Sequence, residues 1–491
     1  MLLESLIKSA ERFPTKKAVA DTTREMSYKQ LLRFSTVMGK IVREATDCPR
    51  VGLVMPGAAA TVGVFHGLLW AGKIVIPLNF VLPPNELQAV LKDSGIDTII
   101  TIKFFENLLK DLPVKLLFLE EMGLKSKMVM SMLRRRPRPP SFHPEDTAVI
   151  LYTSGTDGQP KGVCLSHSNI YENCVATGAH TGFDDNNVFL SVLPMFHVFG
   201  MTGLMFLPIY LGARTYYIPR FNATQVVNTI AEEKVTVFLA IASMYNAMLR
   251  LKSATPAHFK SLRIPVSGGE ALPPATFDQV RERFQFEIMQ GYGLTETSPI
   301  VSVNLPWQHK PGTVGKPLPG IFFRTVDDNG QDVGFEADGE IWIKGHCVMQ
   351  GYYNKPEATA KALNPEGWFA TGDMGRLDPD GYLSVTGRKK EMIIVGGENV
   401  YPREIENVLD RHPAVAQSAV VGLADGRRGE VPVAFVMLTD GAETTEIALR
   451  DFCREHLAGY KVPRSVRIKS DLPRGPTGKI LKRKLMEMLQ A

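Results

Sequence analysis

A loop rich in glycine and hydroxyl side chains follows an apolar run and has the sequence Tyr152-Thr153-Ser154-Gly155-Thr156-Asp157-Gly158-Gln159-Pro160-Lys161-Gly162. The apolar run, Thr147–Leu151, predicts a buried strand that ends at the loop. Glycines let backbone N–H groups turn toward phosphate oxygens, hydroxyl side chains add donors, and Lys161 adds a point charge. The residue order of a Walker A loop is absent. A flexible surface turn is the alternative, and the length and composition of the loop favour phosphate binding.

Two further glycine motifs stand where predicted strands end. Gly291-Tyr292-Gly293-Leu294-Thr295-Glu296 follows Phe286–Gln290, and Ser267-Gly268-Gly269-Glu270 closes Ile264–Ser267. Glycine permits close approach of the backbone to a ligand, an aromatic ring can stack on a base, and a carboxylate suits Mg²⁺. A short glycine turn is also a common structural device. Because ligands bind at the carboxyl ends of strands in open α/β sheets, the grouping favours a single site.

The remainder of the first part of the chain alternates strand-like and helical patterns. Buried strands are predicted at Val51–Met55, Ile74–Leu78, Asp97–Ile102, Leu116–Leu119 and Val235–Ala240. Between the first three, Ala58–Ala71 and Pro84–Ser94 have helical patterns. The fold class predicted from this alternation is α/β with largely parallel sheets.

The pattern changes after Gly320. Turn sequences such as Asp328-Asn329-Gly330 separate β-like runs at Glu340–Lys344 and Tyr382–Thr386, which predicts an antiparallel or barrel-like piece. After Arg388 a compact α+β segment follows, with helices predicted at Pro402–Leu409 and Glu446–His456 and strands at Val415–Gly422 and Val431–Leu438. We therefore expect an N-terminal domain over residues 1–389 and a small C-terminal domain over residues 390–491.

Length and composition exclude several classes of protein. With 491 residues the chain is long enough for two to four domains, and 44% hydrophobic residues are ample for a core. A net charge of +5 is too small over this length to indicate a nucleic-acid surface. Five scattered cysteines without a C-x-x-C pair argue against a disulfide scaffold and a zinc finger. The expected location is the cytoplasm, with contact at the membrane surface as the open alternative.

Two stretches bear on that alternative. Residues Val188–Ala213 carry no formal charge and are long enough to span a bilayer, but glycines and prolines interrupt them, which favours a buried helix and a loop. The Met-rich stretch Lys125–Leu133 precedes a basic, proline-rich segment at Arg134–Pro144. A solvated loop and its flanking helix are the favoured interpretation, and a helix lying on lipid is the other.

Further motifs follow in a characteristic order: Gly367-Trp368-Phe369-Ala370-Thr371-Gly372-Asp373, Thr386-Gly387-Arg388-Lys389-Lys390 and Pro473-Arg474-Gly475-Pro476-Thr477-Gly478-Lys479. With the three glycine motifs above, and with Leu193–Gly200, His309–Gly320 and Gly396–Pro402, they resemble the adenylate-forming superfamily. That superfamily contains acyl-CoA synthetases, non-ribosomal peptide adenylation domains and beetle luciferases. The resemblance runs from about Met26 to Ile480 and is greatest to bacterial fatty-acid:CoA ligases.

The resemblance implies an adenylation site. Its ATP-binding residues would be Thr153, Ser154, Gly155, Thr156, Gly158, Lys161, Gly269, Glu270, Gly291, Tyr292, Gly293, Asp373 and Arg388. Within the site, Thr295 would contact the α-phosphate, Glu296 would hold Mg²⁺, and Asp373 would accept hydrogen bonds from the ribose. Lys479 would bridge the substrate carboxylate and the α-phosphate, which stabilises charge that develops between two anions.

The same resemblance implies a second constellation for transfer to a thiol. Lys390 would be the hinge about which the C-terminal domain rotates, and Gly396 and Gly397 would line the tunnel for the pantetheine of CoA. His197 would orient or gate at the junction of this tunnel and the acyl pocket, although a lone histidine in an apolar run is more often a core residue. The acyl pocket would be walled by Phe199, Gly203 and Met244, with Gly203 leaving room for an alkyl chain.

The function predicted is therefore an ATP-dependent acyl-CoA synthetase for a medium- or long-chain fatty acid, using ATP, Mg²⁺ and CoA. The alternative enzyme is an acyl-AMP ligase or acyl-carrier-protein synthetase, whose partner would be a protein-bound thiol. A catalytically silent binding protein is disfavoured because Lys161, Glu296, Asp373 and Lys479 occur together. We expect no nucleic-acid partner, and a homodimer remains open.

Overall fold

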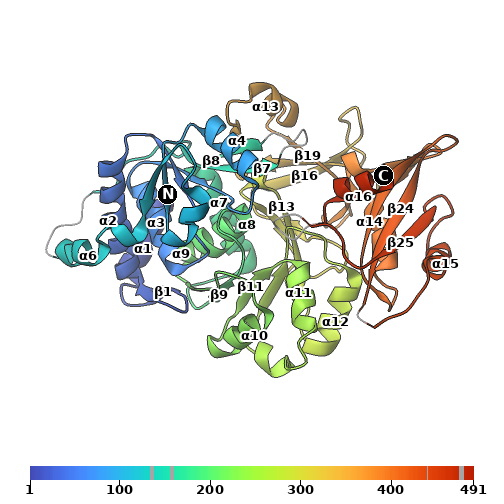
Figure 1. The fold of residues 1–491 in the computed structure, drawn as a ribbon, viewed down its shortest axis with the longest axis horizontal. Helices are drawn as coiled ribbons and strands as arrows, with labels where there is room; N and C mark the ends of the chain where they lie inside the picture. The colour runs from blue at the N-terminus through green and yellow to red at the C-terminus, as the bar shows by residue number, and fades with distance from the viewer. Residues whose placement is uncertain (133–137, 155–159, 440, 475–479, 491) are drawn as a thin grey trace.

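The computed structural model describes residues 1–132, 138–154, 160–439, 441–474 and 480–490. The described residues form four β-sheets, three from residues before Lys390 and one from residues after it (Figure 1). The C-terminal sheet, orange and red in Figure 1, lies at one end of the molecule, beyond the yellow strands. This arrangement is the α/β fold with a separate C-terminal domain that the sequence predicts.

The largest sheet is mostly parallel. Its strand order is β15 (Lys316–Pro317), β14 (Ile300–Val303), β13 (Met289–Gly293), β12 (Ile264–Ser267), β11 (Val237–Ala240), β9 (Val188–Ser191), β10 (Arg214–Tyr217), β1 (Lys17–Ala20) and β2 (Glu25–Ser27). The six strands from β13 to β1 run parallel, and β2, β14 and β15 are antiparallel to their neighbours. Residues of β11 and β12 are buried throughout, as is typical of parallel strands covered on both faces.

The second sheet has the order β18 (Gly351–Tyr352), β8 (Pro160–Ser166), β7 (Thr147–Ser154), β4 (Ile74–Pro77), β3 (Arg50–Leu53), β5 (Thr98–Thr101) and β6 (Lys115–Phe118). The third is antiparallel: β16 (Ile321–Val326), β17 (Gly339–Gly345), β19 (Phe369–Leu377) and β20 (Leu383–Arg388). The third sheet is the antiparallel piece expected after Gly320.

The C-terminal sheet contains β22 (Glu398–Val400), β21 (Ile393–Val395), β24 (Gly429–Leu438), β23 (Val415–Asp425) and β25 (Ser465–Lys469). Its apolar cores are formed by residues after Lys390 alone.

Helices cover the sheets and pack on one another. They are α1 (Leu2–Arg12), α2 (Tyr28–Ala45), α3 (Ala59–Trp70), α4 (Pro84–Ser94), α5 (Glu106–Leu109), α6 (Leu124–Met132), α7 (His167–Thr181), α8 (Val198–Met201), α9 (Leu207–Leu211), α10 (Ala223–Glu232), α11 (Ala242–Leu249), α12 (Pro274–Phe284), α13 (Pro356–Ala362), α14 (Pro402–Leu409), α15 (Glu446–His456) and α16 (Lys482–Gln490). Buried α3 lies so close to α2 that a Cβ at Gly63 would stand 2.1 Å from the ring of Phe34. Glycine is therefore required at this crossing.

Two expectations about local structure need correction. Residues Gly291–Gly293 were expected to follow a strand at Phe286–Gln290, but they form the end of β13 itself and pair with β14. Strand β7 likewise continues beyond Leu151 to Ser154, because it pairs with β8 as a hairpin. Both glycine motifs therefore begin inside paired strands, which fixes their first residues in place.

The uncharged stretch Val188–Ala213 contains buried helical turns and a loop, as predicted, but it begins with a strand that was not predicted. Strand β9 is followed by α8, a π-helical turn over Thr202–Phe206, and α9, all within the core. Among the described residues, no helix combines the length and apolar character needed to cross a membrane. Helix α6 rests on α2 through partly buried Leu124 and Met128, and exposes Val129, Met130 and Met132.

A buried carboxyl group gives the C-terminal domain a predicted pH dependence. Burial raises the pKa of Asp410 on the C-terminal side of α14 to about 7, despite a hydrogen bond of 2.7 Å from the Ser418 hydroxyl. Because the unfolded chain loses this proton near pH 4, the native state should lose stability as pH rises from 4 to 7. We expect Asp410→Asn to remove this loss and to stabilise the protein by up to about 4 kcal/mol at pH 8, since one pKa unit corresponds to about 1.4 kcal/mol.

Thermal unfolding of both proteins at pH 5 and pH 8 measures the effect. The advantage of the variant should be small at pH 5 and full at pH 8, since asparagine keeps the acceptor for Ser418. An equal difference at both pH values would contradict the assignment.

Candidate active site

Several segments of the largest sheet end at the same edge. Strands β9, β11, β12 and β13 are parallel, so their carboxyl ends lie together. The segment with His197 follows β9, α11 follows β11, Gly268–Glu270 follow β12, and Thr295 with Glu296 follow β13. The topology thus brings together motifs that are separated by about 100 residues in the sequence.

The Asp373 carboxylate is the centre of one polar group at this edge. It is 6% exposed, its Oδ2 accepts a hydrogen bond of 2.7 Å from the Tyr292 hydroxyl, and its Oδ1 lies 3.2 Å from Arg388 Nε. Burial, then the charge of Asp373, raise the pKa of Tyr292, so the phenol stays protonated. A carboxylate can accept further hydrogen bonds beyond these two. The arrangement orients Asp373 as an acceptor for hydroxyl groups.

The second polar group surrounds Glu296. Its Oε1 accepts a hydrogen bond of 3.0 Å from the Tyr352 hydroxyl, and burial raises the pKa of Glu296. Asp373 raises that pKa further and Arg388 opposes it, so the two polar groups act on each other electrostatically. Burial of a carboxylate without a cationic partner disfavours its charged form. A bound cation would favour the charged form again.

Tyr352 is a site residue that the sequence analysis missed. Its ring lies 5.5 Å from Lys161 Nζ while its hydroxyl reaches Glu296, so it stands between the lysine of the first glycine loop and the carboxylate. The strand β18 that carries Tyr352 pairs with β8, which carries Lys161. Nothing in the sequence around Gly351-Tyr352 distinguishes this tyrosine from a strand residue in the core.

The Phe199 ring and the Gly268–Gly269 turn form an apolar wall beside these groups. A Cβ at Gly268 would lie 3.2 Å from the Phe199 ring, and Gly269 has a φ of +77° that favours glycine. Glu270 Oε1 accepts a hydrogen bond of 2.9 Å from the backbone N–H of Ser243, at the start of α11. The side chain of Glu270 thus ties the turn to α11, and Met244 follows on that helix.

His197 caps α8, where its Nδ1 accepts a hydrogen bond of 3.3 Å from the Phe199 backbone N–H. The ring is half-buried and lies two residues before Phe199 in the chain, so it is not enclosed in the core. For Gly203, a Cβ would stand 3.0 Å from Leu239 Cδ1 and 3.7 Å from Phe199 Cδ2, so this glycine lies against these two side chains. Its place in the wall of an acyl pocket stays a prediction.

Some predicted residues lie outside the described part of the chain: Gly155, Thr156, Gly158 and Lys479. Their flanks are described. Thr153 pairs with Lys161 and Ser154 with Pro160 across the β7–β8 hairpin. A backbone bond of 2.7 Å from Leu481 N–H to the Pro473 carbonyl, and a bridge between Arg474 and Ile480, close the base of the segment with Lys479.

The residues expected to serve the thiol are in a different place. Gly396 and Gly397 form the tip of the β21–β22 hairpin with φ values of +61° and +92°, and a Cβ at either would meet no described atom within 4 Å. Lys390 is exposed in the short turn Lys389–Glu391 between β20 and β21. In this arrangement the glycine tip is not packed against the polar groups around Asp373 and Glu296.

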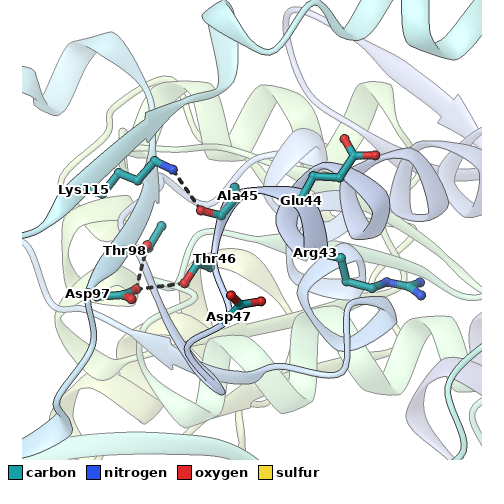
Figure 2. Close-up of a pocket in the computed structure, with 8 residues that line it drawn as sticks. All are labelled: Arg43, Glu44, Ala45, Thr46, Asp47, Asp97, Thr98 and Lys115. Carbon is teal, nitrogen blue, oxygen red and sulfur yellow. Dashed lines mark hydrogen bonds between the residues drawn. The ribbon is translucent and has the colours of Figure 1, made fainter.

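A hollow of about 450 Å³ lies elsewhere, between the end of α2 and strands β5 and β6 (Figure 2). Several of its polar groups bond one another: the Thr46 and Thr98 hydroxyls donate to Asp97, and Lys115 Nζ donates to the Ala45 carbonyl. It opens at the amino ends of β5 and β6, whereas ligands of parallel sheets bind at the carboxyl ends. We therefore assign it no role in the site.

Family models and curated relatives agree with this geometry. The model described as AMP-binding enzyme matches residues 6–353, and the one described as AMP-binding enzyme C-terminal domain matches residues 404–479. The long-chain-fatty-acid–CoA ligase of Bacillus subtilis (strain 168) is 32% identical over 98% of this chain and 93% of its own length. The 2-succinylbenzoate–CoA ligase of Bacillus cereus (strain Q1) is 33% identical over 99% of this chain and 98% of its own length.

Solved structures give the same result. The anthranilate CoA ligase AuaEII in complex with anthranoyl-AMP superposes with a TM-score of 0.92 and 29% identity, covering 99% of this chain and 96% of its own. ATP-bound MatB from Rhodopseudomonas palustris gives a TM-score of 0.91 at 26% identity, covering 100% and 99%, and its apo form gives 0.81. The chain belongs to the AMP-binding enzyme family and is an adenylate-forming CoA ligase.

Proposed function

We propose that the acid activated by this ligase is a medium- or long-chain fatty acid. The observation that supports this proposal is the apolar wall beside the adenylation residues. It consists of the Phe199 ring and the Gly268–Gly269 turn. Leu239 and Ile241 lie beside it, Met244 follows on α11, and residues 198–213 contain no charged side chain. A charged amino group on the substrate would find no partner in that stretch. Relatives of about one third identity are named for acids of different kinds, so they do not decide the substrate. The apolar wall is the feature that favours a fatty acid over the other acids.

The catalytic scheme proposed divides the reaction into two steps. A free carboxylate is a poor electrophile. Its attack on the α-phosphate of ATP would give acyl-AMP and release pyrophosphate, and attack of the CoA thiol on the acyl carbon would then form the thioester and release AMP. Asp373 would hold the ribose, Tyr292 and the Gly269–Glu270 turn would flank adenine, and Thr295 would contact the α-phosphate. Lys161 and the loop between β7 and β8 would bind the outer phosphates. Lys479 would neutralise the charge between the two reacting anions.

Glu296 would hold Mg²⁺ in this scheme. Mg²⁺ usually binds through one or two protein carboxylates and the phosphates of a nucleotide, so a single buried carboxylate beside the phosphate site fits it. The described residues contain no cluster of three or more metal-binding side chains. The ion would supply positive charge to the triphosphate, and Tyr352 would keep the carboxylate oriented.

The experiment measures AMP release by the purified protein with Mg-ATP. Short-, medium- and long-chain acids, 2-succinylbenzoate and anthranilate are compared, each with and without CoA. AMP release that needs CoA and is highest with fatty acids supports the proposal. Preference for an aromatic acid would replace the substrate class, and adenylate formation without transfer to CoA would favour the carrier-protein alternative.

Asp373→Ala tests the nucleotide part of the scheme. The variant should raise the KM for ATP about 10- to 100-fold, because hydrogen bonds to a charged group are lost. The effect on the acid should be small, since Asp373 is expected to touch only the ribose. ATP–pyrophosphate exchange with the preferred acid measures both constants. Arg376→Ala, which removes an exposed arginine from the same strand, should leave the KM for ATP unchanged.

The remaining expectations about partners stay predictions. An acyl carrier protein would need a docking surface that the sequence does not reveal, and a homodimer is likewise open. Peripheral contact with a membrane is favoured only by α6, where Val129, Met130 and Met132 are each more than half exposed beside Lys125 and Lys127. A cytoplasmic location, with or without that contact, remains the expectation from the cysteines, all five of which are free thiols.

A further inference from the structure

Lys390 lies between two groups of ion pairs that belong to different parts of the fold. The turn Lys389–Glu391 joins β20 of the third sheet to β21 of the C-terminal sheet. Lys390 itself is exposed and makes no ion pair with any described residue. Its two neighbours, Lys389 and Glu391, both form ion pairs. The partners of Lys389 come before the turn in the sequence, and the partner of Glu391 comes after it.

Lys389 is held by the part of the chain before it. Its Nζ lies 2.9 Å from Asp328 Oδ1 and 3.1 Å from Glu340 Oε2. Glu340 is in β17, and its Oε1 accepts a hydrogen bond of 3.1 Å from the Gly372 backbone N–H, next to Asp373. The hydrogen bond to Asp328 raises the pKa of Lys389, and Glu340 adds to that rise. Lys389 is therefore fixed to the sheet that also carries the proposed ribose acceptor.

Glu391 is held by the part of the chain after it. Its Oε2 lies 2.9 Å from Lys482 Nζ, and the same ammonium lies 2.9 Å from Glu406 Oε1. Glu406 in α14 also accepts a hydrogen bond of 2.8 Å from the Val420 backbone N–H in β23. Burial works to lower the pKa of Lys482, but Glu406 and Glu391 outweigh it and raise the pKa. The ammonium therefore stays charged and binds Glu391 to the body of the C-terminal domain.

We propose that these two clusters confine the rotation of the C-terminal domain to Lys390, which makes Lys389, Glu391 and Lys482 positioning residues for the transfer of the acyl group to CoA. The proposal rests on the two-step function above. Each cluster lies entirely on one side of Lys390: the partners of Lys389 precede it and the partners of Glu391 follow it. Each cluster can therefore stay intact when the C-terminal domain rotates. A hinge of one or two residues has few ways to absorb a rotation, and the domain then arrives in one orientation.

The ion pairs of the two clusters limit the number of residues that can take part in the rotation. If Lys389 and Glu391 were free, they would share the rotation with Lys390 and the final orientation of the domain would vary. A misplacement of about 1 Å at a reacting group can cost about 100-fold in rate. The segment closed by Pro473 and Leu481 stands directly before Lys482, so the same ammonium also fixes its base. The hinge and the base of that segment are thus held by one side chain.

Glu391→Gln and Lys482→Met test the proposal in the full-length chain. Glu391→Gln leaves Lys482 paired with Glu406, so it releases the hinge with little cost to the fold. Lys482→Met leaves two carboxylates without a cation and is the stronger variant. Lys461→Met is the matched control, because Lys461 Nζ lies 2.7 Å from Glu404 in the same helix α14 but contacts neither the hinge nor Lys482.

Three quantities are measured for each protein: single-turnover formation of acyl-AMP, steady-state formation of acyl-CoA, and hydrogen exchange of residues 386–396. Glu391→Gln should exchange faster in that segment and form acyl-CoA about tenfold more slowly, with acyl-AMP formation within about twofold of wild type. Lys482→Arg, which keeps the charge, should restore most of the transfer rate. Lys461→Met should match wild type in all three.

Unchanged exchange at residues 386–396 in Glu391→Gln would overturn the proposal, as would an unchanged rate of acyl-CoA formation. Equal losses in both half-reactions, shared by Lys461→Met, would also overturn it, since they would indicate general damage to the C-terminal domain. Wild-type protein that forms no acyl-CoA would instead contradict the proposed function. The exchange measurement needs no turnover and would still decide whether the clusters restrain the hinge.

Discussion

Lys479→Ala is expected to lower the rate of acyl-AMP formation about 100- to 1000-fold while the fold stays intact. The size of this effect follows from the proposed role, because a preorganised charge at the point where negative charge develops is worth that much when it is removed. The described flanks on both sides of Lys479 close the segment through a backbone hydrogen bond between Leu481 and Pro473, which the substitution does not remove. The thermal unfolding midpoint should therefore match that of wild type.

Pyrophosphate exchange measures the adenylation step, and chemically prepared acyl-AMP with CoA measures the transfer step alone. Transfer should survive in Lys479→Ala, since the lysine acts in the first step only. Lys484→Ala is the control, because Lys484 is an exposed lysine five residues further along the same segment. Wild-type exchange in Lys479→Ala would remove the central catalytic group from the scheme.

The α/β architecture could be predicted because its signals are local. Helices α4, α14 and α15 and strand β12 have the predicted bounds, since alternation of apolar runs with helical patterns needs no knowledge of distant contacts. The ends of β7 and β13 could not be placed. Each of these strands continues into its glycine motif because an antiparallel neighbour, β8 or β14, pairs with it, and pairing partners lie elsewhere in the sequence.

The residues of the candidate site could likewise be predicted only in part. A motif at a strand end predicted Tyr292 and Glu296, and the resemblance to a known family added Asp373. The structure brings these residues within one another's electrostatic range. Tyr352 was missed because its importance lies in two long-range contacts, to Glu296 and to Lys161, and not in its neighbours along the chain.

Gly293→Ala is expected to lower adenylation about 100-fold through the backbone and without removing any polar group. A Cβ at Gly293 would stand 1.8 Å from the Pro299 carbonyl oxygen and 2.7 Å from its carbon, distances that no side-chain movement relieves. The backbone between Gly293 and Pro299 would have to shift, and it carries Thr295 and Glu296. A displacement of about 1 Å at such groups is enough for the expected loss.

Gly291→Ala is the matched variant on the same strand. Its Cβ would lie 3.3 Å from the Ser302 carbonyl oxygen, a contact that a small adjustment accommodates, and we expect adenylation within about threefold of wild type. Pyrophosphate exchange compares the two variants directly. If both glycines were needed only because the nucleotide lies against the backbone, the two substitutions would lower the rate of adenylation equally. A large difference in the stated direction would mean that Gly293 is required by the packing of β13 against Pro299, which holds the carboxylate of Glu296 in place.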